Sequence, residues 1–189
     1  MDAELFYMSK KGVARIIGGQ WRSRLIDIPK GELIRPTPDR VRETLFNWLG
    51  QDLTGAACLD LFAGSGALGF EAASRGAETV VMVEKDTAVM HCLQASATSL
   101  AAGKVSLVHK HALNFLTYDQ NHFDVIFVDP PFDTDLLCEV LPQLPARLNP
   151  DGCVYVESRR KFVADNTWMI WKQSRAGNVN YCLLKLVNG

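Results

Sequence analysis

The sequence predicts an α/β fold in which a mainly parallel sheet carries helices on both faces. Apolar runs of strand length alternate with segments of helical pattern from residue 58 to residue 156. Such alternation requires parallel strands joined by crossover helices. The last thirty residues differ, because two apolar runs follow one another with only a turn between them. We therefore expect a seven-stranded sheet whose final two strands form an antiparallel hairpin.

Periodicity and turn residues place the elements along the chain. The expected strands of the sheet begin at residue 58 and then cover residues 79–83, 105–108, 121–128, 154–156, 168–173 and 181–187. The expected helices cover residues 40–49, 67–74, 86–100, 112–116 and 135–148. Ahead of them, Val13–Gly18 and Arg24–Ile28 are expected to form a small hairpin around Gly18-Gly19-Gln20-Trp21. Thr37 or Asp39 is expected to cap the first helix.

Composition limits the class of protein. The 189 residues suffice for one domain with a full core, and 48% hydrophobic with 22% charged residues is ordinary for a globular protein. Neither a membrane-spanning apolar run nor a secretory leader is present, so a cytoplasmic protein without membrane contact is expected. The five cysteines form no C-x-x-C pair and are expected to be buried thiols. The four histidines lack metal-ligand spacing, so no metal is expected, and a monomer is the default.

Charge is divided unevenly along the chain although the net charge is only −1. Between Lys10 and Arg42 there are nine basic and three acidic residues, a balance of +6 that leaves −7 for the rest. The division suggests a polyanion-facing arm, residues 1–38, attached to a catalytic body, residues 39–189. A solvated charged surface explains the same run equally well.

A glycine-rich loop follows the first strand of the sheet. The strand Cys58–Leu61 leads into Gly64, Gly66 and Gly69, which have G-x-G-x-x-G spacing, and a run of small helix-forming residues follows. Glycines let the backbone approach a ligand closely, and the helix N-terminus offers unpaired N–H groups to it. The motif alone is a weak indicator, because many nucleotide-binding folds carry it.

The second strand ends in Glu84, 20 residues beyond Gly64. A carboxylate at that strand end can accept hydrogen bonds from both hydroxyls of a ribose. Together, the loop and Glu84 predict a nucleoside-containing cofactor.

The fourth strand runs directly into Asp129-Pro130-Pro131-Phe132. Two consecutive prolines remove two N–H donors and hold a rigid extended turn. What remains is a carboxylate, carbonyl oxygens and an aromatic face, which can bind a planar amino group and stack on the ring that carries it. Taken alone, the tetrapeptide is equally consistent with a proline-terminated strand. In combination with the glycine loop and Glu84, it favours catalysis.

This combination resembles the class I S-adenosylmethionine-dependent methyltransferases that act on exocyclic amines. The resemblance implies a Rossmann-like fold with S-adenosylmethionine as cofactor, Asp60 near its amino group, Lys85 over the adenine, and catalysis by Asp129, Pro130 and Phe132. The cofactor-binding residues that it implies are Asp60, Phe62, Ala63, Gly64, Ser65, Gly66, Glu84, Lys85, His111, Ala112 and Asp129. His111 departs from the aspartate usual at its position, so only the backbone contact of Ala112 is expected there.

Two further segments narrow the resemblance. They are Arg15-Ile16-Ile17-Gly18-Gly19 and the run from Arg35 to Asn47, which begins Arg35-Pro36-Thr37-Pro38. With these segments the chain resembles the RsmD family over nearly its whole length. These are bacterial guanine-N2 methyltransferases of small-subunit (16S) ribosomal RNA. The resemblance implies that the substrate is an assembling or assembled 30S particle. We expect the arm to contact RNA through Arg15, Arg22, Arg24, Arg35 and Arg40.

Other functions remain open at this point. A DNA adenine or protein glutamine methyltransferase could use the same tetrapeptide, although the former usually needs a further recognition domain and the latter usually begins the motif with Asn. An NAD-dependent oxidoreductase would explain the glycine loop and Glu84. It would not explain the two prolines or the closing hairpin. An inactive binding module is disfavoured because every catalytic element is intact.

Overall fold

A seven-stranded sheet forms the centre of the computed structural model, which describes residues 12–28, 37–132 and 134–187. The strand order is β5-β4-β3-β6-β7-β9-β8, with the first five strands parallel and the last two antiparallel, as the sequence predicts. The strands are β3 (Ala57–Asp60), β4 (Thr79–Glu84), β5 (Val105–His109), β6 (Phe123–Val128), β7 (Leu148–Ser158), β8 (Trp168–Ala176) and β9 (Val179–Leu186).

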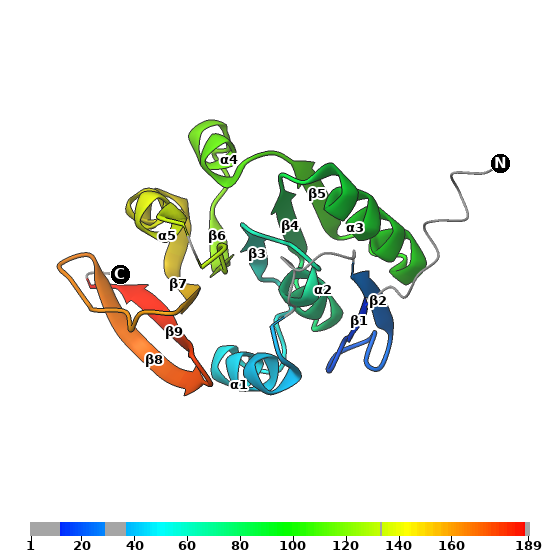
Figure 1. Ribbon diagram of the computed structural model, residues 1–189, viewed down its shortest axis with the longest axis horizontal. Coiled ribbons are helices and arrows are strands. Elements are labelled where there is room, and N and C mark those ends of the chain that lie inside the picture. Colours follow the sequence, from blue (N-terminus) through cyan, green and yellow to red (C-terminus); the bar gives the residue numbers. More distant parts are fainter. Residues whose placement is uncertain (1–11, 29–36, 133, 188–189) are drawn as a thin grey trace.

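Helices cover both faces of this sheet (Figure 1). Helices α1 (Asp39–Leu49), α2 (Ala67–Ser74) and α3 (Thr87–Leu100) contribute to the core on one face. Helices α4 (Ala112–Tyr118) and α5 (Leu136–Val140) contribute to the core on the other. Because side chains alternate along a strand, Phe127 and Tyr155 face α1, whereas Val128 and Val156 face α4 and α5.

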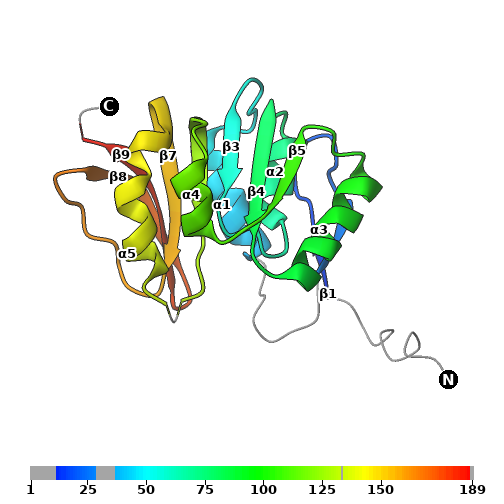
Figure 2. The ribbon, with the colours of Figure 1, turned by 90° about the horizontal axis from the view of Figure 1, so that it is seen from above.

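The carboxyl ends of the five parallel strands lie at one edge of the sheet, and Figure 2 shows three of these strands, β3, β4 and β5, side by side. The first strand, β3, lies between β4 and β6, so the chain progresses outward from it in both directions. In open α/β sheets ligands bind outside the carboxyl ends of the strands at such a reversal. The fold therefore indicates that a ligand binds at the residues that follow β3, β4 and β6.

The predicted N-terminal hairpin is confirmed, with shorter strands than expected. Strand β1 (Gly12–Arg15) pairs antiparallel with β2 (Leu25–Ile28), and the connection between them packs against the end of α2. A Cβ atom on Gly19 would lie 1.8 Å from the Ser74 carbonyl oxygen, so only glycine fits this close approach. Ile16 and Ile26 are buried in the same core as α1 and α2. The boundary between residues 1–38 and 39–189 stays a prediction.

Helix α1 is anchored by a fully buried arginine. The Arg42 guanidinium donates hydrogen bonds to the carbonyl oxygens of Arg15 (2.7 Å) and Thr37 (3.2 Å), and it forms ion pairs with Glu71 (3.2 Å) and Asp39 (2.7 Å). This one side chain therefore joins the hairpin, the start of α1 and helix α2. Breaking a buried ion pair of this kind typically costs about 3–5 kcal/mol.

The predicted side-chain cap of α1 is wrong. The capping residue is Pro38, and no side chain caps this helix. Asp39 instead pairs with Arg42, and Thr37 contributes its carbonyl oxygen to the same guanidinium.

Three other boundaries differ from the sequence-based prediction. The helix expected over residues 135–148 ends at Val140, and two short 3₁₀ helices follow, η2 (Leu141–Gln143), which contains Pro142, and η3 (Pro145–Arg147), which begins at Pro145. Strand β7 is longer than expected, with a register irregularity against β6 between Phe123 and Val125. The closing hairpin turns on only two residues between β8 and β9, Gly177 and Asn178. Within the described residues, no helix has the length and apolar character needed to cross a membrane.

Candidate active site

Four carboxyl groups end four neighbouring parallel strands at the same edge of the sheet. They belong to Glu84 of β4, Asp60 of β3, Asp129 after β6 and Glu157 near the end of β7. Each lies two residues beyond a side chain of the α1 and α2 core, so alternation turns all four toward that face. The sequence identified the first three of them and missed Glu157.

The glycine loop has the predicted close-packed geometry. Gly66 precedes α2 with φ of 79°, in the left-handed region, and a Cβ atom there would lie 2.6 Å from the Phe70 ring. Gly69 has a different reason to be glycine, because its Cβ would lie 2.7 Å from the Met82 sulfur of β4. The first position shapes the loop, and the second lets helix α2 pack directly on the sheet.

Asp60 is buried beneath this loop. One of its carboxyl oxygens accepts a hydrogen bond from the Gly69 N–H at 3.0 Å. Burial raises the pKa of this carboxyl group to about 7, against the opposing effect of the hydrogen bonds from Gly69 and Phe62. The negative charge of nearby Glu84 raises the pKa further. Asp60 therefore positions the start of α2, and its contact with the cofactor's amino group stays a prediction.

Glu84 is held almost entirely by backbone N–H groups. One carboxyl oxygen accepts from Gly64 at 3.0 Å, and the other accepts from Lys85 and Asp86, both at 2.8 Å. These bonds tie the tip of β4 to the glycine loop and fix the carboxylate at the edge of the sheet. An ionised carboxylate has about four acceptor sites, so capacity remains for a ribose hydroxyl.

The ends of β4 and β5 bring together the residues expected around the adenine. Glu84 pairs in register with His109, whose side chain lies 3.0 Å from the Lys85 carbonyl oxygen. His111 immediately precedes α4 and is exposed, and no side-chain cap is made there. Ala112 is buried under this turn. Contacts of these residues with adenine stay predictions.

Asp129 lies beside a second buried carboxyl group. Val128 and Val156 are paired in the parallel ladder between β6 and β7, so the residues that follow them are neighbours. Glu157 is only 4% exposed, and one of its carboxyl oxygens accepts a hydrogen bond from the Tyr155 hydroxyl at 2.9 Å. Burial is the main cause that raises the pKa of Asp129 well above its ordinary value, and the Glu157 charge adds to it. Burial likewise raises the pKa of Glu157.

The rest of the tetrapeptide forms an exposed rim. Pro130 is buried, whereas Phe132 is 37% exposed and lies under the Arg159 guanidinium, whose carbon is 5.6 Å from the ring centroid. The Pro131 carbonyl oxygen accepts a hydrogen bond from the Thr134 hydroxyl at 2.7 Å. Among the described residues, none donates a hydrogen bond to the Pro130 carbonyl oxygen. An acceptor and an aromatic face are thus presented beside Asp129.

The arginines predicted to bind RNA lie on the hairpin and at the start of α1. Arg15, Arg22, Arg24 and Arg40 are exposed, and Arg35 lies outside the described residues. Arg24 also donates to the Ser99 carbonyl oxygen at the end of α3, at 2.8 Å. Their contacts with RNA stay predictions.

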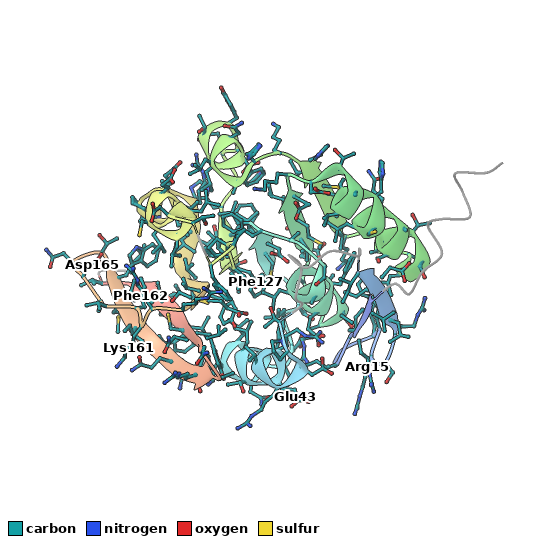
Figure 3. The ribbon with its side chains drawn as sticks, viewed as in Figure 1. Arg15, Glu43, Phe127, Lys161, Phe162 and Asp165 are labelled. Atoms are coloured by element: carbon teal, nitrogen blue, oxygen red, sulfur yellow. The ribbon has the colours of Figure 1, made fainter. Side chains whose placement is uncertain are left out.

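A second basic region lies outside the arm, within what the charge count treated as one neutral-to-acidic body. Residues 158–187 hold six basic residues and one acidic residue, whereas residues 43–157 hold five basic and fifteen acidic. The basic C-terminal segment borders a groove of about 360 Å³, lined in part by Lys161, Phe162 and Arg175. Figure 3 shows Arg15 and Lys161 on opposite sides of the molecule with Phe127 between them. Counting charges in separate windows would have revealed this region.

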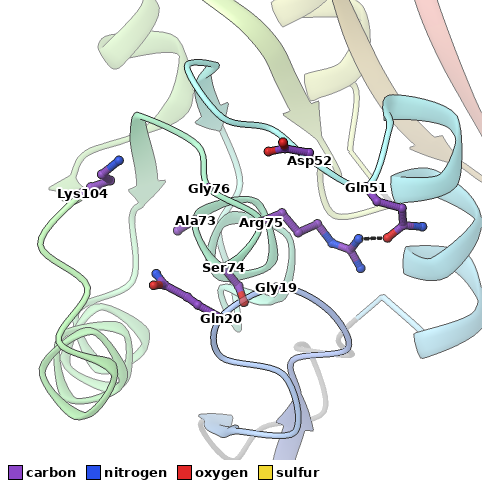
Figure 4. Close-up of a pocket in the computed structure, with 9 residues that line it drawn as sticks. All are labelled: Gly19, Gln20, Gln51, Asp52, Ala73, Ser74, Arg75, Gly76 and Lys104. Atoms are coloured by element: carbon purple, nitrogen blue, oxygen red, sulfur yellow. Dashed lines mark hydrogen bonds between the residues drawn. The ribbon is translucent and has the colours of Figure 1, made fainter.

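A cavity of about 320 Å³ lies at the other end of the sheet, where the hairpin meets the end of α2 (Figure 4). Gln20, Ser74 and Lys104 are among the residues that line it. Because it lies at the amino ends of the strands, it is remote from the four carboxyl groups. Across the described part of the chain, no cluster of three or more possible ligands could hold a metal ion.

The fold and the glycine loop can now be compared with known proteins. A structure from Streptococcus mutans entitled a putative SAM-dependent methyltransferase has a TM-score of 0.74 with 15% identity, covering 94% of this chain and 56% of that one, and it shares the fold. A putative methyltransferase from Escherichia coli is more similar, with a TM-score of 0.84 and 42% identity over 93% of this chain and 98% of that chain. The protein thus has the architecture of a class I S-adenosylmethionine-dependent methyltransferase.

The family follows from the sequence comparisons. The family described as Conserved hypothetical protein 95 matches residues 14–185. Ribosomal RNA small subunit methyltransferase D of Escherichia coli is 42% identical over 180 residues, which cover 93% of this chain and 91% of that protein. The protein of the same name from Haemophilus influenzae is 40% identical over 92% of this chain and 94% of its own length. The chain belongs to this family, the RsmD family, as its sequence motifs predict.

The residues present fit S-adenosylmethionine. Gly64 and Gly66 have positive φ values of 49° and 79°. As glycines they carry no side chain that could obstruct a ligand at these two positions. Glu84 supplies a fixed acceptor for ribose hydroxyls, and Phe62 is half-buried beside the loop. Acceptors at the ends of β3 and β4 suit a ligand with an amino group at one end and a nucleoside at the other.

Proposed function

We propose that this protein transfers a methyl group from S-adenosylmethionine to the exocyclic 2-amino group of a guanine in small-subunit (16S) ribosomal RNA. The observation that carries the proposal is the position of Asp129-Pro130-Pro131-Phe132 at the end of β6, directly beside the strand that leads into the glycine loop. The relatives named ribosomal RNA small subunit methyltransferase D support the RNA substrate.

The cofactor is held by the first two strands of the sheet. The bound S-adenosylmethionine supplies an electrophilic methyl group on a sulfonium. Glu84 accepts the ribose hydroxyls, and the backbone from Phe62 to Gly66 forms the wall against the methionine portion. Asp60, already bonded to the Gly69 N–H, lies where the amino group is expected. This arrangement fixes the methyl group in front of Asp129.

Asp129 and the Pro130 carbonyl oxygen receive the target amino group. The amine of guanine is a weak nucleophile, because its lone pair is delocalised into the ring. Two preorganised acceptors orient its N–H bonds and stabilise the positive charge that develops on nitrogen during attack. The surplus proton leaves afterwards, to Asp129 or to water, so no strong base is needed before the transfer.

Phe132 stacks on the guanine. Its exposed ring is positioned by contact with Arg159, and a base can lie against an aromatic face at a gain of about 1–3 kcal/mol. To enter the site the guanine must be unpaired or flipped out of a helix.

The RNA lies across both basic regions. The arm with its Arg15 and Arg22 and the start of α1 with its Arg40 lie on one side of the site, and the basic C-terminal segment presents Lys161 and Arg175 on the other. Both basic regions attract the phosphates of RNA, whereas the acidic body between them does not. Two separated regions suit a folded RNA or an assembling 30S particle better than a short single strand. The protein is proposed to act as a cytoplasmic monomer.

The proposal is tested by incubating the purified protein with methyl-labelled S-adenosylmethionine and small ribosomal subunits that lack the modification. Nucleoside mass spectrometry of the RNA is expected to show labelled N2-methylguanosine. Labelled N6-methyladenosine, or label in protein alone, would replace the guanine assignment with another amine substrate. Binding of NAD in preference to S-adenosylmethionine would refute the methyltransferase itself.

A further inference from the structure

The groove beside the basic C-terminal segment has no part in the chemical step described above. It is lined by the segment that follows β7 and by both strands of the closing hairpin. Its volume of about 360 Å³ lies at the lower end of the range of small-ligand sites, about 300–1,000 Å³. The groove therefore has room for one nucleotide but not for several.

The strand register places this groove at the same edge of the sheet as Asp129. Asn180 of β9 pairs with Ser158 of β7 on one side and with Arg175 of β8 on the other, and all three line the groove. This row lies one residue beyond Glu157, the neighbour of Asp129. Strand β9 is two strands away from β6, which corresponds to about 10 Å because neighbouring strands lie about 4.8 Å apart. Adjacent nucleotides of an unstacked strand span such a distance.

Arg159 connects the groove to the rim of the active site. Its carbonyl oxygen accepts a hydrogen bond from the side-chain amide of Asn180, in the groove wall, at 2.9 Å. Its guanidinium carbon lies 5.6 Å from the centroid of the Phe132 ring. The backbone of this residue is thus fixed to the groove, and its cation lies over the ring on which the target guanine is proposed to stack.

The charges that line the groove suit a phosphate. Lys161 and Arg175 are both exposed cations, and none of the described residues in the lining is acidic. The Arg175 Nε donates to the Gly177 carbonyl oxygen at 2.8 Å, which orients the guanidinium and uses one of its several N–H donors. Two cations without a nearby acid in the lining attract an anion rather than pair with each other's neighbours.

Phe162 supplies an aromatic face in the same groove. Its ring is half-buried, packs against the core on the α4 and α5 face, and also lines the groove. Figure 3 shows Lys161 and Phe162 together on the side of the closing hairpin, away from Arg15. A ring that is fixed by packing presents a ready surface on which a base can stack. An acidic peptide would satisfy the two cations but would leave this ring without a partner of its own kind.

We propose that the groove binds one unpaired nucleotide next to the target guanine, with its base on Phe162 and its phosphate between Lys161 and Arg175. Arg159 lies at the phosphate that joins this nucleotide to the guanine on Phe132. The inference rests on the proposed methylation of RNA. It implies that the protein selects a guanine whose neighbour is also unstacked, as in a loop or bulge.

Photochemical cross-linking tests the position directly. The photoreactive amino acid p-benzoylphenylalanine is introduced in turn at Gln173 and at Ser174, two exposed residues of the groove wall. Each variant is bound to small ribosomal subunits that lack the modification and is irradiated, and the cross-linked nucleotides are located by reverse transcription. The guanine that the wild-type protein methylates is located in the same RNA. Cross-links are expected at the nucleotide on one side of that guanine.

The matched control carries the same probe at Tyr118, an exposed aromatic residue at the end of α4. It should give no cross-link beside the methylated guanine. Cross-links from the groove that fall only in remote RNA or only in a ribosomal protein would overturn the proposal. An absence of cross-links from bound particles at both groove positions would overturn it as well.

Substitutions separate stacking from charge. Phe162→Leu should raise the concentration of subunits that half-saturates single-turnover methylation by about 10-fold, within the usual cost of losing one base stack. Its salt dependence should stay that of the wild type, because the ring carries no charge. Phe162→Tyr keeps the ring and should restore most of the affinity. Lys161→Gln combined with Arg175→Gln should lower the salt slope by about 0.7, for the single phosphate that the two cations share.

Tyr118→Leu is the control for loss of an aromatic side chain, and the affinity for S-adenosylmethionine should be unchanged in every variant. Wild-type half-saturation in a folded Phe162→Leu would overturn the proposal. An equal loss in Phe162→Tyr and Phe162→Leu would also overturn it, because packing rather than stacking would then explain the loss. If the wild-type protein methylates no RNA at all, the proposed function fails instead, and the two failures are distinguishable.

Discussion

Glu84 and Asp129 occupy equivalent places at the ends of β4 and β6, yet they are held in different ways. Glu84 accepts three hydrogen bonds from backbone N–H groups, two of them from the next two residues. Asp129 follows Val128, which pairs in register with Val156, so it lies beside the buried Glu157 of β7. Backbone bonds are available to any sequence that adopts this loop, whereas the second arrangement needs particular side chains.

The difference separates the two tasks of the site. The carboxylate that is expected to hold the cofactor is fixed by local backbone and survives changes elsewhere. The carboxylate that is expected to act on the amine depends on how β6 pairs with β7 and packs against α1. We therefore expect changes in the arm and its anchor to affect methyl transfer, and changes in the glycine loop to affect cofactor binding.

The largest effect should come from the anchor of the arm. Arg42→Met leaves Glu71 buried without one of its ion-pair partners and removes the donor to the Thr37 carbonyl oxygen. We expect the free energy of unfolding to fall by about 3–5 kcal/mol in urea denaturation. The exposed neighbour Arg40→Met should change it by no more than about 0.5 kcal/mol. Equal stability of the two variants would show that the contacts of Arg42 do not anchor the hairpin and α1 to α2.

Asp129→Ala should separate transfer from binding. Removal of one preorganised acceptor beside a developing charge typically slows a reaction by about 100- to 1000-fold. Asp129→Asn should be milder, because its amide oxygen still accepts one hydrogen bond. Single-turnover assays measure both, and Asp135→Ala, an exposed aspartate just before α5, is the control. Near-normal turnover by Asp129→Ala would make the two-proline turn merely structural.

Glu84→Ala should have the complementary effect. Loss of a charged acceptor for the ribose should weaken S-adenosylmethionine binding by about 1.5–3 kcal/mol in calorimetry. Glu78, which precedes the same strand and pairs with Lys104 at 2.9 Å on the surface, provides the control, and Glu78→Ala should bind normally. Unchanged affinity in a folded Glu84→Ala would remove this carboxylate from the cofactor site.

The smallest effects concern the two basic regions. Replacement of Arg22, Arg24 and Arg40 by Gln should reduce the salt dependence of RNA binding by about 0.9 in slope for each lost phosphate contact, or about 0.7 on single strands. Replacement of Arg160, Lys161 and Arg175 by Gln should do the same. Cofactor affinity should stay constant in both. A wild-type slope in either triple variant would identify that region as a solvated charged surface.

The same comparison explains what the sequence could predict. The glycine loop, Glu84 and the tetrapeptide each occupy a short stretch with local chemical meaning, and the alternation of strands and helices predicted the mainly parallel sheet around them. Glu157 gave a weaker indication, as an acidic residue that ends an apolar strand. Its position beside Asp129 could not be predicted, because it depends on the register between β6 and β7.

Two other incorrect predictions from the sequence have equally specific causes. Thr37 was expected to cap α1, since threonine before a helix usually does so, but the capping position falls on Pro38, whose side chain has no acceptor. A continuous helix through Pro142 and Pro145 was predicted from the apolar spacing. It does not form, because the two prolines lack the N–H groups that its hydrogen bonds require.

The most direct measurement is nucleoside mass spectrometry of small-subunit ribosomal RNA from a strain that lacks this gene. We predict that N2-methylguanosine falls in that strain, returns with the wild-type gene and does not return with Asp129→Ala. An unchanged level in the deletion strain would contradict the RNA guanine assignment. Full restoration by Asp129→Ala would contradict the role given to the carboxylate at the end of β6.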